Sequence, residues 1–219
     1  GFDGEPDALA VVATATEAEA PGFLRVSPCD ATAKTSNVNY LDGFAVPNLV
    51  VVEPDADGRI CVTSHATTHV IVDLFGVFLD PSHGVADVPA SVSADTATRV
   101  FDSRDTGAPV AAGSVTALDL APAGVSPGEA AVVNLTALGA AAPGFVTAFP
   151  CGADVPDTSN LNIVPGQVVS NGAIVAVDET TRLCVFSLSS LELVVDVMGS
   201  LGAPFVGATP VRALSTRRR

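Results

Sequence analysis

Two aspartates stand inside strongly apolar stretches, and they are the residues of the chain most able to do chemistry. Asp73 lies in VIVDLFGVF and Asp196 lies in LVVDVMGSL. A buried carboxylate needs a partner, either backbone N–H groups or an arginine. Two carboxylates in one site could instead catalyse hydrolysis in the manner of aspartic proteases. The aspartates are 123 residues apart, in separate copies of a repeated pattern, so we expect structural partners and no shared catalytic site.

Two arginine-containing segments offer such partners. Residues 99–104 read RVFDSR, and residues 212–217 read RALSTR. We expect Arg99 and Arg104, or their counterparts in the second segment, to pair with the buried aspartates, because guanidinium groups bind carboxylates well. We also expect the segments to pair with the sheet of the preceding repeat. Adjacent repeats of the same or a like chain would then share strands and could assemble into fibres.

Asparagines recur at matching places in the two copies. Asparagine side chains often hydrogen-bond backbone groups in irregular segments, so we interpret them as structural braces. The alternative is a polar groove for a cell-envelope glycan. The absence of Trp and the single tyrosine, Tyr40, weaken that alternative, since sugar sites usually offer an aromatic face. The asparagines are Asn37, Asn39, Asn48, Asn160, Asn162 and Asn171.

Other residue types indicate neither a cofactor nor a metal site. Residues 55–58 (DADG) predict a hairpin turn, with a weak calcium loop as the alternative, but the downstream residues of an EF-hand are absent. The histidines, His65, His69 and His83, are confined to the first copy and its linker. No G-x-S-x-G, H-E-x-x-H or phosphate-binding loop is present. We therefore expect no enzymatic activity.

Four cysteines form two equivalent pairs, Cys29 with Cys61 and Cys151 with Cys184. One pair in each copy predicts one disulfide in each domain and an oxidising compartment. Closing loops of 32 and 33 residues would stabilise each domain by about 3–4 kcal/mol in the chain-entropy description. A zinc site is the weaker alternative, because the sequence has no C-x-x-C motif.

The elements that must position these groups form two copies of one pattern. Residues 61–78 (CVTSHATTHVIVDLFGVF) recur as residues 184–201 (CVFSLSSLELVVDVMGSL). The duplication predicts two domains, with residues 1–80 in the first and 97–219 in the second. Two assignments stay open, because residues 97–128 could complete the first domain and residues 209–219 could begin a further repeat or complete a sheet. Residues 81–96, rich in Pro, Ser, Ala and Asp, are expected to form a linker.

Composition indicates an all-β fold. Hydrophobic residues make up 48% of the chain but aromatic residues only 5%, and there are 19 Gly and 16 Pro. Short Val-rich strands joined by turns every 8–12 residues are typical of antiparallel sandwiches. We expect two tandem β-sandwich domains of the Ig-like or Greek-key kind, with a β-trefoil or small barrel as the alternative.

Charge limits the possible partners. The net charge of −14 argues against nucleic acids and anionic membranes, because phosphates attract Lys and Arg. No apolar run reaches the roughly 18 residues that a membrane span needs. The acidic residues are scattered, which favours a solvated surface on an exported protein.

The combined motifs resemble a tandem module of secreted and cell-surface proteins of actinobacteria and their relatives. The pattern is PGF…PCG, SNLN, a G-x-V strand ending in Asn, THVIVD…G-x-F and an R-x-x-D segment, found here at residues 143–152, 159–162, 166–171, 68–78 and 99–104. The second copy departs from it at Glu192 and Ser200, where His and Tyr are usual. The resemblance implies a non-catalytic, extracellular structural or adhesive repeat, such as a spacer, a segment of a surface fibre or a cell-envelope module. The alternative is a carbohydrate-binding module attached to a secreted hydrolase.

Overall fold

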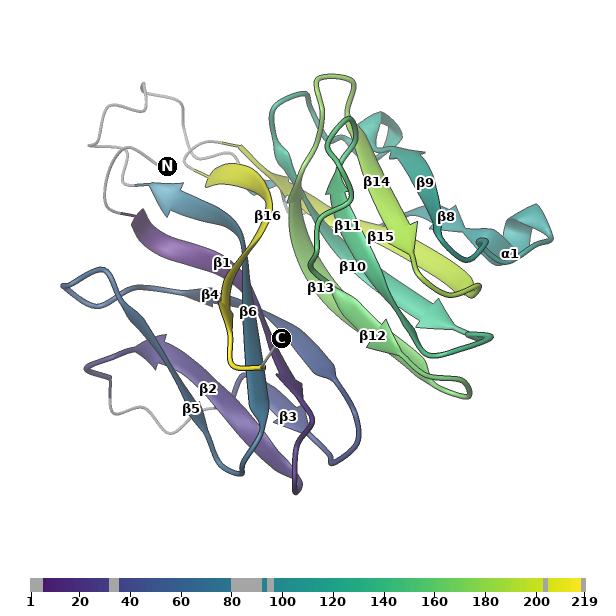
Figure 1. Cartoon of the computed structure of the whole chain (residues 1–219). Coiled ribbons are helices and arrows are strands. Elements are labelled where there is room, and N and C mark those ends of the chain that lie inside the picture. The colour runs from purple at the N-terminus through teal and green to yellow at the C-terminus, as the bar shows by residue number, and fades with distance from the viewer. Residues whose placement is uncertain (1–5, 32–35, 80–91, 94–96, 203–204, 218–219) are drawn as a thin grey trace.

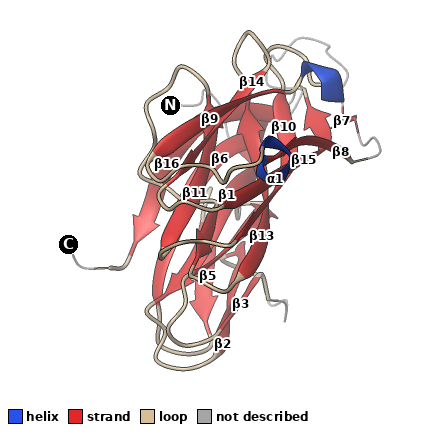
Figure 2. Ribbon diagram, turned by 90° about the vertical axis from the view of Figure 1, so that its right-hand side faces the viewer, coloured by secondary structure: helices blue, strands red, loops and turns tan. Residues whose placement is uncertain are grey.

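The computed structural model describes residues 6–31, 36–79, 92–93, 97–202 and 205–217. The described chain is nearly all β, with only short helical turns (Figures 1 and 2). Each repeat forms two antiparallel sheets packed face to face, and each contains one disulfide. The prediction of two tandem β-sandwiches with one disulfide each is confirmed.

The first domain has sheets of strand order β16-β6-β1-β4 and β3-β2-β5. Its apolar core lies between them and contains Val11, Leu24, Val38, Val50 and Val72. The strands are β1 (Pro6–Thr16), β2 (Gly22–Pro28), β3 (Val38–Tyr40), β4 (Val46–Val52), β5 (Ile60–Ser64), β6 (His69–Leu79) and β16 (Phe205–Ser215).

The second domain repeats this plan. Its first sheet has the order β13-β10-β15, with β7 and β8 both paired to the outer edge of β15, and its second sheet has the order β12-β11-β14-β9. The elements are β7 (Val92–Ser93), β8 (Thr98–Asp102), α1 (Ser103–Thr106), β9 (Ser114–Asp119), η2 (Ala121–Ala123), β10 (Ala130–Leu138), β11 (Gly144–Pro150), β12 (Leu161–Ile163), β13 (Val168–Ala176), β14 (Arg182–Ser187) and β15 (Glu192–Leu201).

Burial along β1 and β10 shows how the sheets are used. In β10, Ala131, Val133, Leu135 and Ala137 are fully buried, and most residues between them are half-buried, as expected for a strand with one face in the core. In β1, every residue from 10 to 16 is buried. Both faces of β1 are therefore covered, one by its own core and the other by neighbouring parts of the chain.

A smaller apolar cluster joins the two domains. Ala10 of β1 contacts the cluster from the first domain, Ala130 and Ile174 contribute from β10 and β13, and Leu201 and Phe205 come from β15 and β16. The rings of Phe78 and Phe205 lie 4.9 Å apart between centroids. This cluster gives the two sandwiches a common apolar interface.

The last strand of the chain completes the first domain. β16 follows β15 of the second domain in sequence but pairs with β6, and Figure 1 shows the yellow β16 beside the blue β6. The completing strand expected within residues 209–219 thus exists, but it belongs to the first sandwich and not to the second.

Residues 97–128 belong to the second domain, so the alternative that they complete the first is wrong. β8 pairs with β15 and β9 pairs with β14. The expectation that residues 99–104 pair with the preceding repeat is wrong for the same reason. Of the expected linker, residues 81–91 and 94–96 lie outside the described residues, and Val92–Ser93 pair with β15.

One sheet edge differs between the domains. In the second domain β9 covers the outer edge of β14, in register from Ser114–Ser187 to Asp119–Arg182. Among the residues that the structure describes, no strand pairs with the equivalent edge of β5. β5 accordingly lies half-buried to exposed, whereas β14 is largely buried.

Gly76 of β6 makes room for β16, which generates a first prediction. A Cβ atom at Gly76 would lie 2.3 Å from Cζ of Phe205 and 2.7 Å from the backbone oxygen of Val206. We expect Gly76→Val to displace β16 and to lower the free energy of unfolding by about 1–3 kcal/mol, the usual cost of overpacking. Hydrogen exchange should show lost protection in residues 205–215, with β8 unchanged.

Gly172→Ala is the matched control. Its Cβ would meet Cδ2 of Leu49 at 3.7 Å and the backbone oxygen of Val133 at 4.0 Å, which are ordinary van der Waals distances. Equal loss of protection in both variants, or retained protection of β16 in Gly76→Val, would contradict the steric argument.

Candidate functional site

Two equivalent segments lie along the outer edges of β6 and β15, and they form the most distinctive site of the molecule. We call residues 92–104 and 205–217 the leader segments. They align at a spacing of 113 residues, whereas β6 and β15 align at 123. Arg99 is the Cα partner of Asp196, and Arg212 is the Cα partner of Asp73.

The register of the two leaders is the same at every position where the pairing of both is described. Phe205 and Val206 pair with β6 as Val92 and Ser93 pair with β15. A register shift follows the arginine in both segments. β16 therefore occupies on the first domain the place that β7 and β8 together occupy on the second.

Each leader arginine binds the aspartate of the strand it covers, but the two pairs differ in geometry. Arg99 donates from Nε to Oδ1 of Asp196 at 2.9 Å and from Nη2 to Oδ2 at 3.3 Å, which is a bidentate contact. Arg212 donates from Nε to Oδ1 of Asp73 at 3.0 Å. The structure thus brings both predicted aspartates together with an arginine, and it keeps the two aspartates in separate domains.

Asp73 is left only partly satisfied. Its side chain is 1% exposed, and Oδ2 has no hydrogen-bond partner within the described chain. Nη1 of Arg212 is instead directed to the exposed Asp157, at 3.5 Å. Burial raises the pKa of Asp73, and the hydrogen bond from Arg212 opposes that rise.

A hydroxyl group fixes the end of each leader. The Oγ atom of Ser103 accepts the backbone N–H of Leu193 at 2.9 Å, and Oγ1 of Thr216 accepts the N–H of Val70 at 2.8 Å. These are equivalent contacts at the start of β15 and β6. Ser103 also donates to the carboxylate of Glu192, so Glu192 has a hydrogen-bonding role at the start of β15.

Asp102 organises the second-domain leader in a way that the first cannot copy. Its carboxylate caps α1 by accepting the N–H of Arg104, and it also binds the guanidinium groups of Arg104 and Arg99. The hydrogen bonds from Arg104 lower the pKa of Asp102 to about 2. Ser215 stands at the equivalent position of β16, and Arg217 lies 3.9 Å from Glu17 instead.

Pairs of asparagines link the two sheets of each sandwich. Asn37 Oδ1 accepts the N–H of Val26 at 2.8 Å, and Asn48 Nδ2 donates to the backbone oxygen of Asn37 at 2.6 Å. Asn160 and Asn171 make the same two contacts in the second domain, at 2.7 Å each. The asparagines therefore connect β4 to β2, and β13 to β11.

Six of the eight residues expected to be buried and polar lie nearer the surface. Asn39 is exposed, Asn37, Asn162 and Asp196 are half-buried, and the side chains of Arg99 and Arg104 are 52% and 50% exposed. Arg99 lies on the edge strand β8 and Arg104 in the helical turn after it, so each guanidinium group can reach both its carboxylate and water. Asn162 still donates to Ser159 Oγ at 3.4 Å.

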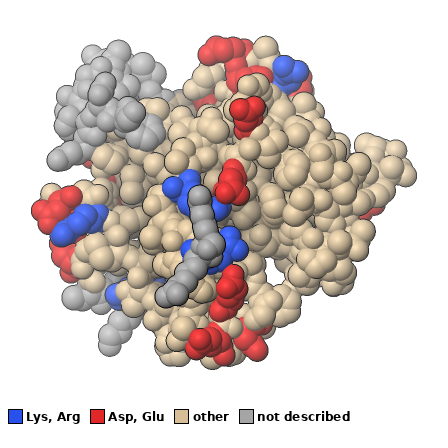
Figure 3. All heavy atoms as spheres, in the orientation of Figure 1, with Lys and Arg blue, Asp and Glu red and all other residues tan. Residues whose placement is uncertain are grey.

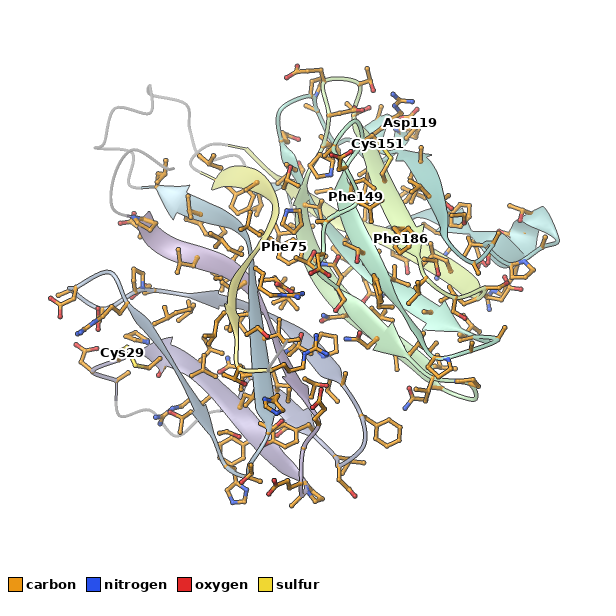
Figure 4. All side chains as sticks on the ribbon, viewed as in Figure 1. Cys29, Phe75, Asp119, Phe149, Cys151 and Phe186 are labelled. Carbon is orange, nitrogen blue, oxygen red and sulfur yellow. A yellow bond between two sulfur atoms is a disulfide. The ribbon has the colours of Figure 1, made fainter. Side chains whose placement is uncertain are left out.

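The disulfides join Cys29 to Cys61 and Cys151 to Cys184, as the spacing predicts. Each connects the residue after one strand of the smaller sheet to the neighbouring strand, and the Cα atoms lie 4.8 and 4.9 Å apart. Figure 4 places Cys29 in the first domain and Cys151 in the second. Each bridge therefore ties one sheet internally.

The remaining polar candidates have local roles. Asp55 accepts the N–H groups of Asp57 and Arg59 and binds the Arg59 side chain, so its oxygens hold the turn together. His65 stacks on Phe23, and Nδ1 of His69 lies 3.0 Å from the backbone oxygen of Thr216. His83 lies outside the described residues.

A hollow of about 240 Å³ lies between the two domains, beside the end of β16. Thr14, Phe145, Asn162, Arg212 and Arg217 line it. On the face shown in Figure 3, basic side chains gather near the middle, with acidic side chains next to them. The hollow is open and its charges are mixed, so it does not have the shape of a buried catalytic pocket.

Comparison with known proteins adds no assignment. No family model, curated protein or solved structure matches the chain. In the part of the chain that the structure describes, no group of three or more His, Cys, Asp or Glu side chains is placed to hold a metal ion. None of the described helices is long and apolar enough to span a membrane.

Sequence reasoning missed the hydroxyl contact and the domain that receives β16. The hydroxyls of Ser103 and Thr216 could have been found, because each stands four residues after the leader arginine. No sequence signal distinguishes pairing of β16 with the first domain from pairing with the second, since both central strands present an aspartate and a glycine at the same places.

The contact between Arg212 and Asp73 gives a second prediction. Arg212→Ala leaves a buried carboxylate without its charged partner, and we expect a loss of about 3 kcal/mol in unfolding free energy at pH 7. This is the lower end for buried pairs, because Arg212 is partly exposed. Arg59→Ala, which removes an exposed pair, should cost about 1 kcal/mol or less.

The loss should depend on pH and should be reversed by neutralising the aspartate. Without Arg212 the raised pKa of Asp73 rises further, so the folded variant binds a proton more tightly than the unfolded chain. The difference in unfolding free energy between the unmodified chain and Arg212→Ala, measured by denaturant titration, should therefore shrink as pH falls from 7 toward 4. Asp73→Asn in the Arg212→Ala background should recover much of the stability, and no recovery together with a pH-independent deficit would contradict the pairing.

Asp102 gives a third prediction, in which stability depends on pH in the opposite direction. Its pKa is lowered from 3.8 to about 2, so its contribution to stability is present above pH 4 and is lost between about pH 4 and pH 2. The melting temperature of Asp102→Asn should be lower than that of the unmodified chain at pH 6, and the two should converge at pH 2. Asp105→Asn, in the same helical turn, is the control and should show no such convergence.

Proposed function

We propose that the chain is a non-catalytic, extracellular structural module that acts as a rigid spacer or adhesive segment of a secreted or surface protein. One observation carries this proposal. In both domains the buried or half-buried aspartate is bound by a leader arginine that holds a strand to the sheet. The ionisable groups that could have served a reaction are occupied in strand pairing.

Rigidity between the two domains supports a spacer role. β16 follows the second domain and pairs with the first, and the apolar cluster around Phe205 contains residues of both. Asn171 Oδ1 also accepts the N–H of Leu49 across the boundary, at 3.4 Å. Such contacts restrict the angle between the domains, which a spacer needs and a loosely tethered pair lacks.

The two disulfides fit the same setting. The disulfide in each sandwich is stable in an oxidising environment, and it lowers the entropy of the unfolded chain. The excess of acidic residues favours repulsion between copies at low salt, which would limit non-specific association outside the cell.

A carbohydrate-binding module is the second candidate, favoured by the hollow between the domains. Phe145 offers one ring, and Thr14, Asn162 and Arg212 offer hydrogen-bonding groups around it. A sugar site of useful affinity commonly stacks pyranose rings on aromatic faces. One half-buried ring, already packed 5.7 Å from Phe186, is a small platform.

Glycan binding separates the two candidates and is the fourth prediction. The unmodified chain should show no sugar-competed retention on peptidoglycan or cellulose and no signal on a glycan array, because the lining of the hollow offers a single, half-buried aromatic ring for stacking. Phe145→Ala should behave identically. Retention that a specific free sugar competes, and that Phe145→Ala abolishes, would favour the carbohydrate-binding module.

A further inference from the structure

β16 is bonded to one domain and paired with the other. It follows β15 of the second domain in the chain, yet its backbone hydrogen bonds are made with β6 of the first. The second-domain leader differs, because β8 continues through α1 into β9, which pairs inside the same domain. β16 therefore follows the second sandwich in the chain, while its described backbone pairing holds it to the first.

The ion pair between β16 and its socket uses one carboxylate oxygen, whereas that of its counterpart uses two. Arg99 binds both oxygens of Asp196, but Arg212 binds only Oδ1 of Asp73. The other oxygen of Asp73 is buried and has no partner within the described chain. An unsatisfied buried carboxylate oxygen is costly, but β16 of a second copy would leave it in the same state, so this oxygen does not favour the intrachain strand over an interchain one.

All contacts of β16 with the rest of the molecule can form between two chains as well as within one. Phe205 packs in the cluster between the domains, and Gly207 approaches Ala176 of β13 closely, where a Cβ would lie 2.6 Å from that side chain. In these contacts Ala130, Ile174 and Ala176 belong to the second domain, which moves with β16, whereas Ala10 and Phe78 belong to the first. A first domain from another copy could therefore receive the strand and the adjoining surface together.

We propose that β16 is an exchangeable strand and that the socket on β6, formed around Asp73, Gly76 and the N–H of Val70, binds β16 of a second copy of this chain. The inference rests on the proposed structural function, because it names the partner that such a module engages. Reciprocal exchange closes a dimer, and exchange in one direction continues into a head-to-tail row of copies. Intrachain and interchain pairing differ mainly in effective concentration.

Disulfide trapping in the full chain tests this fifth prediction. Leu74 and Val211 are Cα partners across β6 and β16. A chain with Leu74→Cys and a separate chain with Val211→Cys are mixed, incubated under mild oxidation and analysed on non-reducing gels. We expect a cross-linked heterodimer that reaches about a quarter of the material near 1 mM, about the effective concentration of a short tether, and falls roughly threefold at 0.1 mM.

The second domain supplies a matched control. Thr98 and Val197 occupy the same register on β8 and β15, so Thr98→Cys mixed with Val197→Cys reports the same geometry in a sandwich whose leader remains in place. This mixture should give little heterodimer. A chain carrying both Leu74→Cys and Val211→Cys establishes that the pair can form a bond, and mass spectrometry confirms that the native disulfides are intact.

The outcomes are decisive. Exchange of β16 is supported if the heterodimer forms in the mixture of Leu74→Cys with Val211→Cys and not in the mixture of Thr98→Cys with Val197→Cys. No heterodimer while the double variant cross-links internally overturns it, as does equal heterodimer in both mixtures, which would indicate general unfolding. The glycan experiment uses the unmodified chain and a different measurement. Sugar binding would therefore count against the proposed structural function without changing the result for strand exchange, and absence of the heterodimer would count against strand exchange without changing the glycan result.

Discussion

The pairing of a guanidinium group with a carboxylate inside an apolar strand is the interaction on which the architecture depends. Asp73 and Asp196 interrupt apolar runs in β6 and β15, and water cannot reach Asp73. Such a group is tolerated only where a charged donor arrives from a neighbouring strand. The central strand therefore requires a leader beside it, and the arginine fixes which residue of the leader lies opposite the aspartate.

Register follows from this pairing. A slip of one residue along β6 would move the arginine away from the carboxylate and turn the side chains of the leader to the other face. The contact from the hydroxyl of Thr216 to the N–H of Val70 adds a second fixed point near the other end of the pairing. Two polar contacts within an otherwise apolar edge give specificity to an alignment that valine side chains alone would leave weakly defined.

Much of the fold could be predicted from the sequence, because its signals are local or repeated. Cysteine spacing predicted both disulfides, valine-rich strands and turn residues predicted the sandwiches, and the motif around Asp73 revealed the duplication. The pairing of β16 with the first domain, where it forms the edge strand beside β6, could not be predicted in this way. β6 and β15 offer nearly the same socket, and the choice depends on the interface around Phe205, where residues from five strands meet only after folding. Asn39 is exposed because it alternates with the buried Val38 and Tyr40 along β3, a strand that was not predicted there.

The uncovered edge of β5 also changes the environment of one disulfide. Cys61 is exposed on the outermost described strand of its sheet, whereas Cys184 is 8% exposed and lies between β11 and β9. Thiol–disulfide exchange requires a thiolate to reach a sulfur atom in line with the S–S bond, so access governs its rate. Small thiol reductants should thus open the Cys29–Cys61 bridge before the Cys151–Cys184 bridge, and the first sandwich would lose its covalent constraint while the second still retained its own.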